Sequence, residues 1–95
     1  KWDFATEGNA TGWGNQEKQH YTARRPENAR VENGRLIIEA RAETLPDSAG
    51  KAYTSARLVT RGRAAWTYGF YEIRAKVPCG RGTWPAIWML PEDPA

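Results

Sequence analysis

The stretch WTYGFYEIRAKVPCGRGTWPAIWMLP (residues 66–91) holds three of the five tryptophans of the chain. Within it, residues 70–77 alternate between small or apolar side chains and a second set that includes Glu72 and Arg74. A period of two is typical of a strand with one face in a core. We therefore predict a half-buried strand at 70–77, whose other face carries a carboxylate and a guanidinium close together.

The run at 84–90 continues this pattern after a Gly-rich turn, and it places Trp84 and Trp88 on one face. At strand pitch these two residues would lie about 13 Å apart. Indoles stack on flat apolar faces, and charged groups beside them bind hydroxyls, so this set suits an extended, hydroxyl-rich ligand. The alternative is that both indoles belong to the core, as most large aromatic side chains do.

Upstream of this stretch, short strand-like runs at 1–4, 35–42 and 53–61 are separated by turns rich in Gly, Pro and Asn. A long Gly- and Asn-rich loop carries Trp13, and Asn33-Gly34 is a hairpin signal. No segment keeps a helical period, so the predicted fold class is all-β with antiparallel strands. About five strands are too few to cover two sheets, which predicts that the chain is part of a larger domain.

Composition excludes several classes of function. The net charge of +3 comes without a basic cluster or a nucleic-acid motif, which argues against nucleic acid as a partner. No apolar run approaches the length of a membrane span. The single Cys79 excludes a disulfide framework, and the single His20 argues against a Ser-His-Asp or Cys-His catalytic centre. Asn9-Ala10-Thr11 is a glycosylation sequon that matters only in a eukaryotic secretory route.

Carboxylates are the remaining candidates for catalysis, but their spacing identifies no pair. Glu39 and Glu43 share a strand face at roughly 13 Å, whereas paired glycosidase carboxyl groups lie about 5–9.5 Å apart. Glu72 has Arg74 on the same face, and a cation nearby favours the ionised carboxylate. Glu72 therefore suits the role of hydrogen-bond acceptor better than that of general acid.

Three blocks, in this order, resemble glycoside hydrolase family 16, and most of all its bacterial-type endo-1,3-β-glucanases or laminarinases. They are GWGNQEKQHYT (12–22), RPENARVENGRLIIEAR (25–41) and YTSARLVTRGRAAWTYGFYEIRAKVPCGRGTWPAIWMLP (53–91). The resemblance implies a concanavalin A-like β-jelly-roll sandwich with a glucan-binding cleft on its concave sheet. It also implies a retaining double displacement by two Glu side chains.

In the family, the catalytic Glu-x-Asp-x-x-Glu signature, or a form one residue shorter, follows the Trp-Met-Leu-Pro segment. The resemblance therefore implies that the Glu pair lies beyond Ala95 and that no catalytic residue is present here. We expect residues 1–95 to be the N-terminal part of a single family 16-like catalytic domain, incomplete at both ends.

The resemblance assigns substrate binding to five residues. Asn15 matches a loop asparagine that contacts sugars on the glycone side, and Glu72 and Arg74 match a Tyr-Glu-x-Arg strand that binds substrate hydroxyls. Trp84 and Trp88 match cleft tryptophans of laminarinases. We favour the cleft over the core for Trp88 and leave Trp84 open between the two. Arg57 and Trp66 are interpreted as structural.

The remaining expectations also come from the resemblance. The partners are a β-glucan polysaccharide or oligosaccharide and the remainder of the same domain, on this or another chain. No cofactor is expected in this segment, although a structural Ca²⁺ is possible in the complete domain. The expected location is extracellular. Two alternatives stay open: a non-catalytic β-1,3-glucan recognition domain on the same fold, and an inactive fragment.

Overall fold

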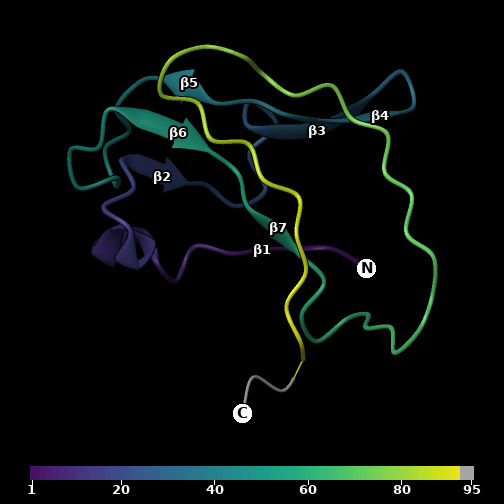
Figure 1. The fold of residues 1–95 in the computed structure, drawn as a ribbon. Helices are drawn as coiled ribbons and strands as arrows, with labels where there is room; N and C mark the ends of the chain where they lie inside the picture. Colours follow the sequence, from purple (N-terminus) through teal and green to yellow (C-terminus); the bar gives the residue numbers. More distant parts are fainter. Residues whose placement is uncertain (93–95) are drawn as a thin grey trace.

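A computed structural model of the chain describes residues 1–92 (Figure 1). These residues form short strands and one 3₁₀ helix, joined by long irregular connections. The elements are β1 (Asp3–Phe4), η1 (Asn9–Gly14), β2 (Gln19–Tyr21), β3 (Ala29–Glu32), β4 (Arg35–Ile38), β5 (Arg41–Ala42), β6 (Tyr53–Ser55) and β7 (Leu58–Val59). No helix in this part of the chain is long and apolar enough to cross a membrane.

The strands make three small sheets, and the all-β prediction is confirmed. β1 pairs with β7 and β3 with β4, while β6 lies between β2 and β5 (Figure 1). The pairing is antiparallel except between β2 and β6, which run parallel. The long connection from β2 to β6 contains the β3–β4 hairpin and β5, which gives the chain enough length to return in the same direction.

The predicted hairpin at Asn33-Gly34 is confirmed. Both residues have positive φ, 53° and 76°, as the two central positions of a type I′ turn require. Gly34 adopts this conformation without a steric penalty. The turn places Val31 opposite Leu36 and Ala29 opposite Ile38, which fixes the register of β3 against β4.

The predicted strand at 53–61 is divided into β6 and β7 because its backbone changes partner. Thr22 N–H donates to the Ser55 carbonyl at 3.0 Å, and Ala5 N–H donates to the Arg57 carbonyl at 2.9 Å. The chain thus pairs first with β2 and then with β1. The predicted strand at 35–42 is likewise divided, into β4 and β5, on either side of Glu39.

The interior of the described residues is polar. The apolar side chains that are buried there are those of Ala5 and Ala56, whereas Asn28 and Thr54 are fully buried. The Asn28 amide nitrogen donates to Thr54 Oγ1 at 3.0 Å, and its amide oxygen accepts from Thr22 Oγ1 at 2.8 Å. This small polar network joins Thr22, directly after β2, to Asn28, directly before β3, and Asn28 to Thr54 within β6.

The strands predicted at 70–77 and 84–90 are absent from the described residues. The stretch after β7 runs as a long irregular trace around the sheets (Figure 1), and the face predicted to be buried is exposed, with Ile73 at 62%. An isolated strand is not stable, because its backbone groups need a neighbour to bond. No segment of residues 1–92 provides that neighbour, so the alternating pattern stays without a partner here.

Candidate functional site

The structure places Asn15 directly after η1, on an exposed loop. Its amide nitrogen donates to Glu17 Oε2 at 3.0 Å, and Gln19 Nε2 donates to the other oxygen of Glu17 at 2.7 Å. This chain of polar side chains orients Asn15 at the surface and leaves its amide oxygen free to accept a hydrogen bond.

Glu72, Arg74, Trp84 and Trp88 all lie on the irregular stretch after β7 and are exposed. Within residues 1–92, Glu72 and Arg74 form no ion pair, so the pairing of two charges on one strand face is not seen. The indoles of Trp84 and Trp88 are 73% and 61% exposed. Their exposure leaves ring surface open to a ligand, and their role in sugar binding stays a prediction.

Arg57 nevertheless links Trp88 to the N-terminal half of the chain. The guanidinium carbon of Arg57 lies 5.6 Å from the centre of the Trp88 ring and 4.1 Å from that of Trp13. Tyr21 meets the Trp13 ring edge-on, with centroids 5.5 Å apart. We call Trp13, Tyr21, Arg57 and Trp88 the aromatic–arginine cluster. From the sequence, Arg57 was interpreted as structural. The feature that could have pointed to this cluster is the position of Trp13 between Gly12 and Gly14, which indicates a shaped loop.

Trp13 is held in this cluster by its own loop. Gly12 and Trp13 both have positive φ, near 58° and 55°, which turns the indole back toward the start of η1. There the ring packs on Gly8, where a Cβ atom would lie 2.3 Å from Trp13 Cδ2. The indole nitrogen donates to Asn9 Oδ1 at 3.4 Å. One side of the indole is therefore covered by backbone, so Trp13 is an anchor within the protein.

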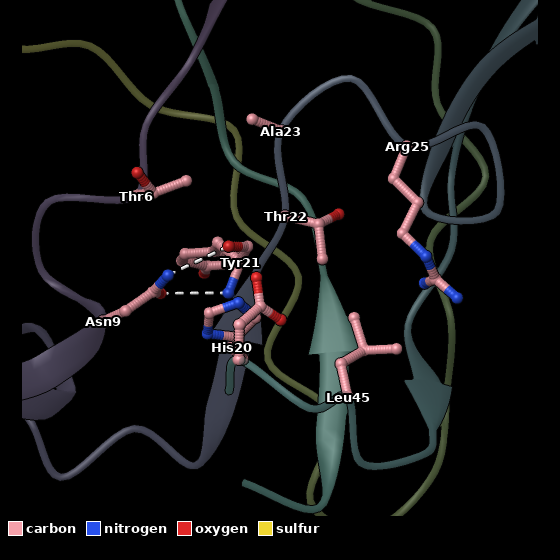
Figure 2. Close-up of a pocket in the computed structure, with 9 residues that line it drawn as sticks. Thr6, Asn9, His20, Tyr21, Thr22, Ala23, Arg25 and Leu45 are labelled. Atoms are coloured by element: carbon pink, nitrogen blue, oxygen red, sulfur yellow. Dashed lines mark hydrogen bonds between the residues drawn. The ribbon is translucent and has the colours of Figure 1, made fainter. Parts of the chain in front are cut away.

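Asn9 also fixes β2. Its amide nitrogen donates to the Tyr21 carbonyl at 2.9 Å, and its amide oxygen accepts from the Tyr21 N–H at 3.0 Å (Figure 2). The side chain thus acts as an extra backbone partner for the strand. Asn9 is also the first residue of the Asn9-Ala10-Thr11 sequon, but its amide nitrogen is committed to this hydrogen bond.

A cavity of about 410 Å³ opens beside these residues (Figure 2). None of the five predicted binding residues lines it. Its polar groups are partly committed, since Asn9 bonds to Tyr21 and Arg25 pairs with Glu43. The lining residues are Thr6, Asn9, His20, Tyr21, Thr22, Ala23, Arg25, Leu45 and Asp47.

Arginines hold the carboxyl groups of Glu39 and Glu43 in their ionised forms. Arg25 Nη1 lies 2.7 Å from Glu43 Oε2, and Thr54 Oγ1 donates to the same oxygen at 2.6 Å. These two hydrogen bonds, Arg25 first, lower the pKa of Glu43 from 4.5 to about 2. The hydrogen bond from Arg30 likewise lowers the pKa of Glu39. A general acid needs a raised pKa, so neither carboxyl group suits that role.

No group of three or more His, Cys, Asp or Glu side chains in the described part of the chain comes together in a way that fits a metal ion.

Comparison with known proteins gives close relatives. No family model matches the chain. It is 65% identical over 92 residues to a β-glucanase of Rhodothermus marinus, covering 97% of this chain and 30% of that protein. It is 44% identical over 95 residues to a glucan endo-1,3-β-glucosidase of Cryptopygus antarcticus, covering 98% and 34%. A β-1,3-glucan-binding protein of Penaeus monodon is 58% identical over 40 residues, covering 42% and 11%. The chain thus spans about a third of the length of the first two relatives.

The solved structures to which the chain is similar are also β-glucanases. The laminarinase of Rhodothermus marinus has a TM-score of 0.63 at 62% identity, covering 73% of this chain and 26% of that one. A non-specific endo-β-1,3(4)-glucanase of family 16 has a TM-score of 0.65 at 50% identity, covering 73% and 27%. These neighbours are β-jelly-roll sandwiches, and the all-β chain is similar to one part of that fold. The chain belongs to glycoside hydrolase family 16.

Proposed function

We propose that the protein hydrolyses internal 1,3-β-D-glucosidic linkages in laminarin-like β-glucans by a retaining double displacement. Residues 1–92 would supply walls of the cleft and not the catalytic carboxylates. The observation that carries the proposal is the exposed indole of Trp88, 61% accessible, in a chain 65% identical to a β-glucanase. Trp84 adds a second exposed ring on the same stretch.

The chemistry of the exposed groups suits a β-glucan. An indole face stacks on the C–H face of a glucose ring, which needs no charge and tolerates repetition along a polymer. Glu72 and the free amide oxygen of Asn15 accept hydrogen bonds from sugar hydroxyls, while Arg74 supplies donors. As the family resemblance implies, we place the nucleophile and the acid/base on a pair of carboxyl groups outside the described residues. Glu39 and Glu43 do not suit the general acid, because arginines lower the pKa of both.

The test is Trp88→Ala in the protein at its full natural length, with release of reducing sugar from laminarin as the readout. We expect kcat/KM to fall by about 1–3 kcal/mol in free-energy terms, the scale of one lost anchor contact. Trp2→Ala is the matched control, because Trp2 is also 61% exposed. A variant that melts far earlier yet keeps normal kinetics while folded would assign Trp88 to the core and contradict its role in substrate binding. A wild-type protein that releases no reducing sugar from laminarin would contradict the hydrolase itself.

A non-catalytic β-1,3-glucan-binding protein is the second candidate. The Penaeus monodon relative favours it, since its name describes binding and not hydrolysis. The same laminarin experiment separates the two functions. Saturable binding without any release of reducing sugar would support the recognition domain, whereas release that Trp88→Ala slows would support the hydrolase.

Secretion forms part of the hydrolase proposal. A β-glucan polymer is too large and too polar to cross a membrane, so the enzyme must meet it outside the cell. We expect laminarin-degrading activity from the source organism in the culture fluid, and activity confined to the washed cell extract would overturn this part of the proposal.

A further inference from the structure

Arg57 joins three segments that are far apart in the sequence. It lies between β6 and β7, where its carbonyl accepts the Ala5 N–H at 2.9 Å and fixes its backbone. Its half-buried side chain reaches over Trp13 of η1 at 4.1 Å and over Trp88 of the stretch after β7 at 5.6 Å. The guanidinium thus bridges the N-terminal loop and the predicted glucan-binding tryptophan.

The two indoles are the contacts that orient this guanidinium. Arg25, Arg30 and Arg41 each pair with a carboxylate within 3.0 Å, whereas Arg57 takes part in no ion pair or side-chain hydrogen bond among residues 1–92. A guanidinium lying flat on an indole is attracted by the negative face of the ring. Its planar shape also stacks, which an ammonium group does not do.

The Trp13 side of this bridge is rigid. The Trp13 ring packs on Gly8, meets Tyr21 edge-on at 5.5 Å and is hydrogen-bonded to Asn9. The Trp88 side is different, because its stretch pairs with no strand in the described residues. Arg57 therefore connects Trp88 to the fixed position of Trp13, and its guanidinium lies over one face of the Trp88 indole while much of the ring stays exposed.

We propose that Arg57 is a positioning residue for glucan binding, which holds the Trp88 indole in place by stacking between Trp88 and the anchored Trp13. This inference rests on the proposed role of Trp88 in binding a 1,3-β-glucan. Arg57 acts through Trp88, so its loss weakens binding without changing the bond that is cleaved.

The experiment is a double-mutant cycle on the protein at its full natural length, with laminarin as the substrate. Arg57→Met keeps the length of the side chain and removes its charge and plane. We expect it to raise KM about fivefold, the scale of one cation–π contact, with kcat changed by less than about twofold. Arg57→Lys should fall between the wild type and Arg57→Met, because it keeps the charge without the planar stack.

The cycle is closed by adding Arg57→Met to Trp88→Ala. If Arg57 acts through Trp88, the double variant has the same KM as Trp88→Ala alone. Arg35→Met on the exposed face of β4 is the control for loss of a positive charge, and its KM should equal that of the wild type.

The outcomes separate this inference from the proposed function. Additive effects of Arg57→Met and Trp88→Ala, or an unchanged KM in Arg57→Met, overturn the positioning role while the function stands. An unchanged KM and kcat in Trp88→Ala overturns the proposed role of Trp88 itself. If Arg57→Met does not fold, Arg57→Lys decides, since a wild-type KM in that variant contradicts a stacking role.

Discussion

At the scale of the residue, Glu43 shows how a carboxylate of this chain is committed to structure. It accepts hydrogen bonds from Arg25 at 2.7 Å and from the buried Thr54 at 2.6 Å, and Arg41 Nε lies 3.5 Å from the same oxygen. Arg25 also donates to Asn28, which is fully buried. One carboxylate oxygen therefore ties the polar interior to two arginines.

This commitment predicts a pH dependence of stability. The pKa of Glu43 is about 2 in the folded chain and 4.5 ordinarily, so the folded state prefers the ionised form. Its contribution is fully present above about pH 4.5 and is lost as the pH falls toward 2. Glu43→Gln should therefore melt earlier than the wild type at pH 7, and the difference in Tm should vanish near pH 2.

Thermal melts between pH 2 and 7 check this prediction. Glu27→Gln is the control, because Glu27 faces the same Arg25 from 3.7 Å and is more exposed. Its melting curve should follow that of the wild type at every pH. A Tm difference for Glu43→Gln that persists unchanged at pH 2 would show that the loss comes from packing and not from charge.

At the scale of the element, η1 is shaped by the contact of Trp13 with Gly8. Gly8 has φ of −92°, so its backbone suits any residue, and the reason for glycine is steric. A Cβ atom there would lie 2.3 Å from Cδ2 of the indole. Lys51 supports the same loop from outside, since its ammonium donates to the Asn9 carbonyl at 2.6 Å.

Gly8→Ala should therefore destabilise the protein by about 1–3 kcal/mol, the usual cost of overpacking. The loss should be much smaller when Trp13 is first shortened to Leu, because the clashing ring atoms are then gone. Urea unfolding of the four proteins in this cycle measures both values. Equal losses in the two backgrounds would mean that Gly8 is required for its backbone and not for the contact with Trp13.

At the scale of the whole molecule, apolar surface is left uncovered. The described residues bury two alanines as their apolar interior, while Tyr71, Ile73, Val77 and Ile87 remain between 44% and 62% exposed. The chain spans about 30% of its Rhodothermus marinus relative. The alternating pattern at 70–77 is that of a strand with a partner, and the relatives contain further chain that is able to provide one.

Hydrogen exchange tests this interpretation. In the 95-residue chain, the amides of 70–77 and 84–90 should exchange at rates close to those of an unstructured peptide. In the protein at its full natural length, the same amides should be protected by pairing with added strands. Fast exchange in both samples would show that the two stretches never form strands, whatever surrounds them.

The sequence predicted local features well where the local pattern is sufficient. The type I′ hairpin at Asn33-Gly34, the all-β class and family membership follow from turn residues, alternation and the three long blocks. It predicted strands at 70–77 and 84–90 that the described residues do not contain, because alternation shows that a strand suits the sequence but not that a neighbour is present. It also missed Arg57 as a partner of Trp88.

By itself the sequence determined the strand-like periodicity, the turn at Asn33-Gly34 and the set of polar and indole groups whose chemistry suits a β-glucan. These properties depend on residue type and on spacing along the chain. The tertiary structure decided that Gly8, Trp13, Arg57 and Trp88 meet, and that Glu43 is held ionised by Arg25. Such contacts join residues distant in sequence, and their geometry is set only when the backbone brings the segments together.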